Sequence, residues 1–539
     1  MKWCLRWLAR LLWNFRAYNT GALTAPGPVL LIPNHVSWFD WLFLGVCLDD
    51  DWKFVTSSTT AETSWVHKLI MVNRRTFSID TNSPYAVRHM AEHLQKGGRL
   101  VLFAEGRLSK TGTLMKLFDG TGFLIHKTGA KVITAYIRSA QRLPFSPNPG
   151  KKLWFPEVTT HFSDLASAPQ REHLSASKAR AIYTRWLRDE VVNLQFETEM
   201  KFGPGNVPLA IAQTACREPR KRILEDVTLK PLTYRRLLTA AGAMASVLQG
   251  ALGRANDRIG VLLPNVNGMP ITLLALWRLG KTPAVLNFST GPATMLACSN
   301  VATLKQIVTS RVFVEKAKLD IEPLENAGVE FLYLEDLRKR IGLFDRLAAL
   351  FGARFAPTLP YVGIADESTA VVLFTSGSEG VPKGVELTHR NILANIRQVL
   401  SVCDIQDDDR IFNCLPMFHS FGLTAATILP LVRGLYSFTY PSPLHYRVVP
   451  TAVYNTDCTI FFGTNTFLNG YARKAHPYDF RSLRYLFAGA EKLQEVTALT
   501  WARKFGVRIL EGYGATECSP CISVNTPLAP LYGAAGRLL

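Results

Sequence analysis

Apolar, strand-like runs that alternate with helical stretches occur in two successive series along this chain, and they constrain its fold more than any other feature. The first series lies between residue 29 and about residue 137 and contains VLLIP, RLVLFAEG and AKVITAYI. The second contains RIGVLLPN, TPAVLNF, KQIVTS and VEFLYL. This rhythm is typical of α/β domains, and 539 residues are too many for one ordinary core. We therefore expect an α/β fold with two tandem units.

The segment between the two series marks the expected domain boundary. A long helical stretch, residues 175–197, follows the first series and closes it. Next comes KFGPGNVPLAIAQTACREPRKR, which mixes Gly, Pro and basic residues as inter-domain segments do. We predict a first domain over residues 21–197, a linker over 198–225 and a second domain over 226–539.

The N-terminal stretch MKWCLRWLARLLWNF predicts an amphipathic helix within residues 1–20. Basic residues interrupt its apolar run and no small-residue cleavage site follows, which argues against a signal peptide. Two interpretations stay open: a helix that lies in the headgroup region of a membrane, or a first helix packed on its own domain. In a helix the basic stripe is Lys2, Arg6 and Arg10, and the rest of the surface carries Trp3, Trp7, Leu8, Leu11 and Phe15.

The basic composition points to an anionic partner. Lys and Arg outnumber Asp and Glu by 61 to 42, which gives a formal charge of +19. Lipid headgroups, an acidic carrier protein, nucleotide phosphates or nucleic acid would be attracted, and a solvated basic face is the alternative. Because no aromatic-basic nucleic-acid module is present, we expect no nucleic-acid partner.

Neither a membrane span nor a disulfide framework is expected. No run of 18 or more residues is solidly apolar, and even the charge-free stretch 411–432 contains Asn, Pro and His, so we expect a peripheral protein. The nine cysteines are odd in number and scattered, which favours a reducing compartment. Cys518 and Cys521 form a single Cys-x-x-Cys pair, which we interpret as incidental.

A His and an Asp follow the first strand-like run, in PNHVSWFDW. They are His35 and Asp40, and a continuous helix would separate positions five apart by roughly 140°. The two meet only if His35 lies in the turn before the helix, with Asn34 or Ser37 as its cap. A carboxyl group on one ring nitrogen fixes the tautomer and leaves the other nitrogen to act as a base. One such pair also arises by chance.

A second polar block, FAEGRLSKTG, follows the run RLVL. Gly106 permits close backbone approach, and Arg107 offers a planar fork for phosphate oxygens. The alternative is a structural pair of Glu105 and Arg107 at the end of a strand.

Together the two blocks resemble the glycerolipid acyltransferase family, whose members pair NHxSxxD with a later FPEGxR. Here the blocks read NHVSWFD and FAEGR, with Ala104 in place of Pro, and the resemblance covers roughly residues 25–190. It implies that His35 is the catalytic base and that Asp40 orients it. His35 would take the proton from a free glycerol hydroxyl of a lysophospholipid, and the oxygen would attack an acyl thioester.

The same resemblance assigns the glycerol phosphate to Glu105, Gly106 and Arg107. Many members of the family also carry an Arg in an intermediate block resembling FxxxR. Here FSIDT has Thr81 at that place, and Arg74 and Arg75 are the nearby substitutes.

A third block, FTSGSEGVPKGVELTH, is rich in small residues and hydroxyls. A Gly-rich turn lets backbone N–H groups converge on phosphate, and hydroxyl side chains add donors. It is not a Walker loop, because Pro382 stands where that motif needs Gly. A flexible surface loop is the alternative interpretation.

Three further blocks follow: LPMFHSFGL, FAGAEKL and EGYGATECSP. In this order the four resemble the adenylate-forming superfamily, which includes acyl-CoA and acyl-carrier-protein synthetases. The resemblance implies ATP and Mg²⁺ as cofactors, with Glu517 helping to bind the metal. His419 and Phe421 would line the acyl pocket, although a packed core histidine is the alternative for His419. The ATP and AMP would be bound by Thr375, Ser376, Gly377, Ser378, Gly380, Lys383, Gly489, Ala490, Glu491, Tyr513, Gly514 and Thr516.

Two departures from that superfamily matter. Glu379 stands where many members have Thr, which places negative charge close to phosphate. The chain also ends at GAAGRLL, before the family's ribose-binding Asp and the small C-terminal domain with its catalytic Lys. We therefore expect this chain to bind nucleotide and to adenylate fatty acid poorly.

The tandem order resembles a family of bacterial bifunctional enzymes that join an acyl-acyl-carrier-protein synthetase to a 2-acylglycerophosphoethanolamine acyltransferase. The stretches FTSGSEGVPKGV, LPMFHSFGL, YPSPLHYRVVP and AGAEKLQE carry this resemblance. It implies that ATP activates a fatty acid, that acyl-carrier protein or coenzyme A accepts it as a thioester, and that the first domain transfers it to a lysophospholipid. The location implied is the cytoplasmic face of the bacterial inner membrane.

Two rival functions stay open. One is a stand-alone lysophospholipid or lysophosphatidate acyltransferase with a non-catalytic nucleotide-binding module. The other is a basic, non-enzymatic protein that binds membrane or nucleic acid.

Overall fold

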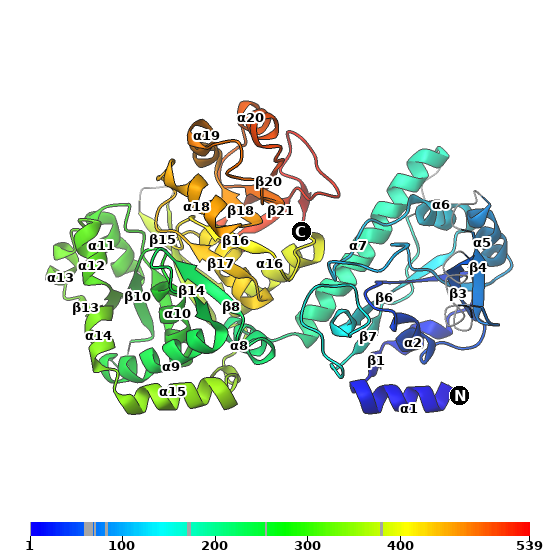
Figure 1. The fold of residues 1–539 in the computed structure, drawn as a ribbon, viewed down its shortest axis with the longest axis horizontal. Helices are drawn as coiled ribbons and strands as arrows, with labels where there is room; N and C mark the ends of the chain where they lie inside the picture. The colour runs from blue at the N-terminus through cyan, green and yellow to red at the C-terminus, as the bar shows by residue number, and fades with distance from the viewer. Residues whose placement is uncertain are drawn as a thin grey trace. The chain divides into compact units, whose positions relative to one another are not determined.

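The computed structural model describes residues 2–58, 68, 72–80, 85–169, 174–253, 256–377 and 381–539 (Figure 1). The chain forms two compact units. Unit 1 holds Met1–Phe202 and Leu400–Gln406, and unit 2 holds Gly203–Val399 and Asp407–Leu539. Both are α/β, which confirms the predicted fold class.

Unit 1 is built on a sheet whose described strands follow the order β1-β7-β6-β2-β5-β3-β4. Only the β6–β7 pair is antiparallel among them. Successive residues of β2 alternate between two apolar clusters, with Leu31 in one and Leu30 and Ile32 in the other. This strand is therefore buried on both faces, as parallel strands are when helices cover the sheet. The strands are β1 Arg16–Tyr18, β2 Val29–Pro33, β3 Trp52–Ser57, β4 Thr76–Ile79, β5 Arg99–Val101, β6 Lys131–Arg138 and β7 Thr159–Phe162.

The longest helix of unit 1, α7, packs along α6 and β6. A Cβ on Gly122 of α6 would lie 2.5 Å from Thr184 Oγ1 of α7, so the small residue permits the close approach of the two helices. The helices are α1 Lys2–Trp13, α2 Asp40–Gly45, α5 Ala86–Gln95, α6 Asp119–Thr128 and α7 Ala176–Phe202, with short 3₁₀ turns η1 Thr20–Thr24 and η2 Ala140–Arg142.

The N-terminal helix combines features of both interpretations left open by its sequence. Ala9 and Trp13 are buried in the core of unit 1, whereas Trp3 and Leu11 are exposed. Phe15, expected on the apolar face of this helix, lies instead after its end and is buried, because the chain turns there into β1, which pairs with β7. The helix is thus anchored by one face and presents tryptophans on the other.

Unit 2 contains two sheets. The first has the order β13-β12-β10-β11-β14-β15, with only β14–β15 antiparallel among the described pairs. The second has the order β22-β21-β20-β19-β18-β16-β17-β8-β9, with a parallel centre from β20 to β8. Its strands are β8 Arg222–Asp226, β9 Leu232–Thr233, β10 Arg258–Leu262, β11 Thr282–Val285, β12 Gln306–Thr309, β13 Glu330–Tyr333, β14 Thr369–Ser376, β15 Pro382–Thr388, β16 Arg410–Asn413, β17 Tyr436–Thr439, β18 Ile460–Gly463, β19 Tyr485–Ala488, β20 Ile509–Gly514, β21 Cys521–Val524 and β22 Arg537–Leu538.

Helices cover these sheets and connect the parallel strands (Figure 1). They are α8 Val207–Arg217, α9 Tyr234–Ala251, α10 Gly268–Arg278, α11 Pro292–Val301, α12 Arg311–Lys316, α13 Glu322–Asn326, α14 Leu334–Arg340, α15 Leu343–Phe355, α16 His389–Val402, α17 Leu429–Arg433, α18 Val448–Thr456, α19 Asn465–Lys474 and α20 Glu495–Phe505. The short helical segments are η3 Leu359–Tyr361, η4 Phe421–Ile428 and η5 Thr516–Cys518.

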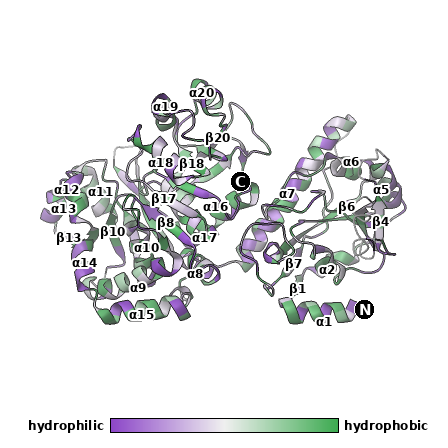
Figure 2. Ribbon diagram, in the orientation of Figure 1, coloured by the Kyte–Doolittle hydropathy of each residue, from purple (hydrophilic) through white to green (hydrophobic). Residues whose placement is uncertain are grey.

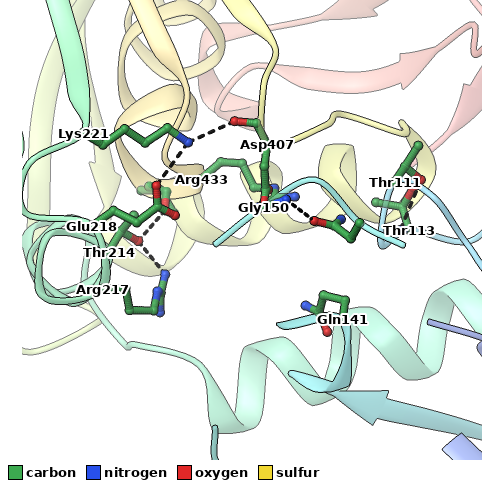
Figure 3. Close-up of polar contacts among 12 residues, drawn as sticks. Thr111, Thr113, Gln141, Gly150, Thr214, Arg217, Glu218, Lys221, Asp407 and Arg433 are labelled. Carbon is green, nitrogen blue, oxygen red and sulfur yellow. Dashed lines mark hydrogen bonds and ion pairs between the residues drawn. The ribbon is translucent and has the colours of Figure 1, made fainter. Parts of the chain in front are cut away.

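The segment expected to be the linker, residues 198–225, contains the division between the two units, after Phe202, and is itself ordered secondary structure. It contains the end of α7, all of α8 and most of β8. Asn206 caps α8 by accepting a hydrogen bond from Leu209 N, and Lys221 donates to the carbonyl of Asp407 at 2.9 Å (Figure 3). Lys221 also pairs with Glu218 at 3.2 Å. The Gly and Pro residues of this stretch therefore punctuate two elements and do not mark a flexible connection.

None of the helices in the described parts of the chain combines the length and apolar character that crossing a bilayer requires. Residues 411–432, the most apolar stretch, fold into β16, η4 and most of α17. Figure 2 shows hydrophobic and hydrophilic residues interspersed along the helices.

Candidate active site

The two acyltransferase-like blocks lie side by side because the strands that precede them are neighbours. β2 and β5 pair in parallel, and Leu102 N donates to Leu31 O at 2.9 Å just beyond that pairing. The carboxyl ends of parallel strands meet at one edge of a sheet, which is where α/β proteins commonly bind ligands. The loop with His35 and the loop with Glu105 therefore share one edge of unit 1.

His35 and Asp40 are in direct contact. His35 Nδ1 lies 2.9 Å from Asp40 Oδ2, and the imidazole keeps 22% of its surface exposed. His35 lies in the turn after β2, and α2 begins at Asp40, as the sequence required for a contact. The predicted cap is wrong, since Phe39 occupies the N-cap position and makes no side-chain cap. Asn34 instead accepts from Ile137 N at 2.7 Å, and Ser37 Oγ accepts from Phe39 N at 3.2 Å.

Asp40 is fully buried and organises the turn. Its Oδ2 also accepts the backbone N–H groups of Val36 at 2.7 Å and Ser37 at 2.9 Å. Burial raises the pKa of Asp40 above its ordinary 3.8, and the hydrogen bonds from His35 and these amides oppose that rise. Oδ1 has no hydrogen-bond partner among the described residues. The carboxyl group is thus committed to the imidazole and its loop.

Glu105 is placed differently from its predicted role. It is 2% exposed, and its two oxygens accept from His35 N at 2.9 Å and from Met115 N at 2.8 Å. Desolvation raises the pKa of Glu105 from 4.5 to about 7. Because a carboxylate with both oxygens taken by backbone amides does not face substrate, Glu105 positions the His35 loop. The expected contact of Glu105 with glycerol phosphate is not supported by this placement.

Gly106 and Arg107 turn outward at the same edge. Gly106 has a φ of +66°, and a Cβ there would lie 2.3 Å from the ring of Phe118. Arg107 is exposed, and within the described residues its guanidinium makes no hydrogen bond or ion pair. A free guanidinium beside the His35 loop is available for an anionic group.

Several residues that hold His35 were not foreseen. The ring of Phe103 stacks on the imidazole with centroids 4.1 Å apart and an interplanar angle of 29°. Ser109 is buried and its N donates to His35 O at 2.7 Å. Ser109 belongs to a hydroxyl-rich turn in which Thr111 and Thr113 also contact each other at 2.9 Å (Figure 3). Phe103 is the first residue of FAEGR and Ser109 lies two positions after it, so only their place in or next to that block could have signalled them.

The intermediate basic residue is engaged elsewhere. Arg75 donates to the carbonyls of Gly45, Leu48 and Asp49 at 3.0–3.3 Å. It therefore supports the turn after α2, and its expected substitution for the family's Arg is not supported. Thr81 lies outside the described residues.

The nucleotide blocks of unit 2 also converge. β14 and β15 form a hairpin in which Thr375 is opposite Lys383 and Ser376 is opposite Pro382. Gly377 N donates to Val381 O at 3.0 Å, which closes the hairpin, and Lys383 is exposed. Ser378, Glu379 and Gly380 lie outside the described residues. β15 contacts η5, so Lys383 and Thr516 come from adjoining segments.

The residues expected to frame adenine lie at the carboxyl ends of two neighbouring parallel strands, after β19 and in the last two positions of β20. Gly489 and Ala490 come directly after β19, and Ala490 has a φ of +66°. Glu491 Oε2 accepts from Thr466 N at 2.9 Å and from Thr466 Oγ1 at 2.7 Å. Tyr513 is exposed at the end of β20, and a Cβ on Gly514 would lie 2.1 Å from Pro520 O. The exposed ring of Tyr513 therefore lies beside the tight backbone at Gly514. Glu491 links the loop after β19 to the start of α19, where Thr466 lies.

A magnesium ion is compatible with this donor set. Glu517 is exposed in η5, next to Thr516. Over the described parts of the chain, no three His, Cys, Asp or Glu side chains gather to hold a metal. Mg²⁺ bound with a nucleotide commonly takes one or two carboxylates and completes its shell with phosphates and water. Glu517 would be the protein ligand at this place.

The two residues expected to line an acyl pocket, His419 and Phe421, lie after β16. His419 is exposed, its ring contacts Phe418 with centroids 4.7 Å apart, and desolvation by the surrounding protein lowers the pKa of its imidazole below the ordinary 6.5, so the place in an acyl pocket stays a prediction. Phe421 contacts Phe462, and its ring would lie 3.3 Å from a Cβ on Gly489. Phe421 therefore reaches the loop expected to frame adenine.

Curated relatives match the second half of this architecture. The long-chain-fatty-acid–CoA ligase of Salmonella typhimurium is 28% identical over 321 residues, covering 54% of this chain and 57% of the ligase. The medium-chain fatty-acid–CoA ligase of Escherichia coli strain K12 is 28% identical over 351 residues, covering 60% and 59%. The chain therefore spans less than two thirds of the length of these relatives.

Solved structures share the fold. A benzoate CoA ligase from Burkholderia xenovorans LB400 has a TM-score of 0.54 at 20% identity, covering 62% of this chain and 66% of the ligase. The O-succinylbenzoate coenzyme A synthetase from Bacillus subtilis, in complex with AMP, has a TM-score of 0.51 at 22% identity, covering 62% and 80%. Family comparisons extend over both units: the acyltransferase family matches residues 14–138, and the AMP-binding enzyme family matches residues 211–539. The chain thus belongs to the AMP-binding enzyme family and carries an acyltransferase domain ahead of its AMP-binding domain.

Proposed function

We propose that the protein reacylates lysophospholipids. In unit 1 an acyl group passes from a thioester, carried by acyl-carrier protein, to the free hydroxyl of 2-acylglycerophosphoethanolamine. Unit 2 contributes to the ATP-dependent activation of fatty acid that supplies the thioester. The single observation that carries this proposal is the contact of His35 Nδ1 with Asp40 Oδ2 at the edge of the sheet.

The contact determines what His35 can do. Asp40 holds Nδ1, which leaves Nε2 as the atom that accepts a proton. Nε2 would take the hydroxyl proton as the substrate oxygen attacks the thioester carbonyl. When the tetrahedral intermediate collapses, the C–S bond breaks, the new ester remains and the thiol leaves with the proton from His35. No enzyme nucleophile is required, because the hydroxyl attacks directly.

The substrate class rests on the surroundings of His35. Arg107 is exposed at the same sheet edge and suits the phosphate of a glycerolipid. Trp38, in the His35 loop, is 46% exposed, and its N donates to Phe145 O. Phe145 in turn contacts Trp154, which is 67% exposed. Exposed tryptophans are typical of the membrane interface, which supports a lipid substrate and a peripheral position on a membrane. The family resemblance implies the cytoplasmic face of the bacterial inner membrane.

For unit 2 we propose that the hairpin from Thr375 to Lys383 binds the phosphates of ATP, with Thr516 and Glu517 beside it. Glu517 would hold Mg²⁺, which supplies positive charge to the phosphates. Gly489, Tyr513 and Gly514 would flank adenine. The relatives named as fatty-acid–CoA ligases support a fatty acid as the second substrate. The charge of +19 suits an acidic carrier protein as thiol donor, and coenzyme A is the alternative.

The test uses the purified chain and an acyl thioester labelled in its acyl group. Label is followed into phospholipid with 2-acylglycerophosphoethanolamine, its choline and glycerol analogues, or lysophosphatidate as acceptor. Acyl-carrier protein and coenzyme A are compared as carriers, in the absence of ATP. We expect acyl transfer that needs no ATP and that is fastest with the ethanolamine lipid as acceptor and the carrier-protein thioester as donor.

Each outcome has a definite meaning. Transfer to lysophosphatidate alone would favour the stand-alone acyltransferase. Binding of lipid without any transfer would overturn the enzymatic proposal and favour the non-enzymatic membrane protein.

A further inference from the structure

Helix α15 of unit 2 presents an unusually apolar face to solvent. Phe344 is 88% exposed, Phe351 is 65% exposed and Phe355 is 64% exposed. Helical spacing places Leu347 on the same stripe, and Leu347 is also exposed. Soluble proteins seldom expose a contiguous row of large apolar side chains unless it binds something.

The opposite face of α15 fixes it to the unit. Ala349 is buried, and a Cβ on Gly242 of α9 would lie 3.1 Å from the Ala349 Cβ. The two helices therefore pack closely at a glycine–alanine contact. This anchorage holds the row of phenylalanines away from the core.

The surroundings of this face are basic. Between positions 338 and 355, the end of α14 and the length of α15 carry five basic residues and one acid, and one of the five, Lys339, pairs with Asp336 of α14 at 4.0 Å. The acid is Asp345, whose carboxylate accepts a hydrogen bond from Gly342 N at 2.9 Å and so caps the start of α15. The basic residues are Arg338, Lys339, Arg340, Arg346 and Arg354.

A concavity beside α15 adds a further basic group. It has a volume of about 760 Å³ and is lined by Arg235 together with Leu347, Phe351 and Phe355. Arg235 Nε is buried without a hydrogen-bond partner among the described residues. Arg235 places a guanidinium beside an apolar hollow, an arrangement that suits the phosphate of a phospholipid whose acyl chain lies in the hollow.

We propose that the exposed face of α15, with the concavity at Arg235, binds the surface of an anionic phospholipid bilayer. Here the face denotes Phe344, Leu347, Phe351 and Phe355. A helix that lies in the headgroup region needs a continuous apolar face and arginines that reach the phosphates. Both are present, because Arg346 and Arg354 belong to the same helix as the apolar row.

The observations on α15 are independent of the acyltransferase site. The inference rests on the proposed function only for its purpose, because a bilayer is where a lysophospholipid is found. It adds a membrane contact on the AMP-binding unit, separate from the tryptophans of unit 1.

The experiment uses the full chain and vesicles of phosphatidylcholine with or without 30% phosphatidylglycerol. Vesicle sedimentation is measured for wild type, for Phe344→Glu/Phe351→Glu, and for the matched control Val496→Glu/Leu499→Glu. The control adds the same charge to exposed apolar positions of α20. Thermal melting checks that both variants fold. In parallel, a photoactivatable lipid in the vesicles labels wild type, and the labelled peptides are identified by mass spectrometry.

We expect the α15 variant to bind anionic vesicles at least about tenfold more weakly than wild type, and the control to bind within about twofold. Label is expected in residues 341–359, and 0.5 M NaCl should weaken wild-type binding. Equal binding by the two double variants overturns the inference, whether or not that segment is labelled. A dimer of wild type would also overturn the inference if the α15 variant disrupted the dimer but still bound vesicles, because a second copy of the chain would then cover the face.

Acyl transfer to lysophospholipid in detergent micelles separates this inference from the proposed function. The α15 variant should transfer at the wild-type rate in micelles. If wild type transferred no acyl group, the proposed function would be wrong, and the vesicle experiment would still decide whether α15 binds a bilayer.

Discussion

Asp40 Oδ2 lies 2.9 Å from His35 Nδ1 and is shared with two backbone amides of the same turn. The carboxyl group therefore fixes both the orientation of the imidazole and the conformation of the loop that carries it. A side chain that shapes its own turn in this way is rigid before substrate arrives, which is a requirement of a base that must meet a hydroxyl in one geometry.

Asp40→Asn should keep the turn and lose most of the transfer rate. The amide oxygen can still accept the three N–H groups, but the neutral side chain no longer supports an imidazolium. We expect the rate of acyl transfer to fall by about 10² to 10⁴, with little change in melting temperature. Steady-state kinetics and calorimetry check this. The control is Asp49→Asn, because Asp49 is exposed and pairs only loosely with Lys2 at 3.4 Å. A variant within threefold of wild type would contradict the assigned role.

Glu105→Gln should change how stability depends on pH. The pKa of Glu105 is raised from 4.5 to about 7 in the folded protein, so the unfolded chain releases this proton at lower pH than the folded chain. Wild type therefore loses up to about 3 kcal/mol of stability as pH rises from about 4.5 to 7, and no more above that. The variant lacks this loss. Calorimetry of the unit 1 transition from pH 5 to 8 should show the two stabilities converging or crossing, and parallel profiles would refute the burial argument.

Gly106→Ala should destabilise unit 1 more than Gly129→Ala does. Both glycines have positive φ, +66° and +60°, so both variants carry the backbone strain of about 1–2 kcal/mol. Only at Gly106 would the new methyl meet a neighbour, the ring of Phe118. The difference in melting temperature between the variants isolates that contact. Equal losses would mean that Phe118 moves aside without cost.

Lys383→Met should weaken nucleotide binding without unfolding unit 2. Lys383 is exposed on β15, and the hairpin that carries it adjoins η5 with Thr516. Losing one charge-assisted contact to phosphate corresponds to about tenfold or more in affinity. Calorimetric titration with ATP and Mg²⁺ measures it. Lys316→Met, on exposed α12, is the control, and equal affinities for the two variants would remove the hairpin from the site.

The sequence predicted the parts of the site that depend on local order along the chain. A strand, a turn and a helix place His35 against Asp40 whatever the rest of the fold does, so the spacing was sufficient. The α/β class followed from the alternation of apolar runs. The role of Glu105 could not be read in this way, because its partners, His35 N and Met115 N, are set by the pairing of β2 with β5 and by a later loop.

The segment at the boundary between the units shows what a local sequence pattern does not reveal. Gly and Pro in residues 201–222 indicated a boundary, and the units do divide there, after Phe202, but Asn206 and Pro208 are also the start of α8. A local pattern of turn residues does not distinguish a flexible connection from a capped helix. The deciding contacts are long-range, since Asn206 Nδ2 donates to Tyr361 O and Ile364 O.

The most direct test of the central claim is acyl transfer by His35→Ala. Label from an acyl thioester is followed into 2-acylglycerophosphoethanolamine without ATP, with vesicle binding and melting temperature measured on the same preparations. We predict that transfer falls by at least about 10³-fold while binding and folding are retained. Transfer at the wild-type rate by a folded His35→Ala protein would contradict the assignment of this imidazole as the base.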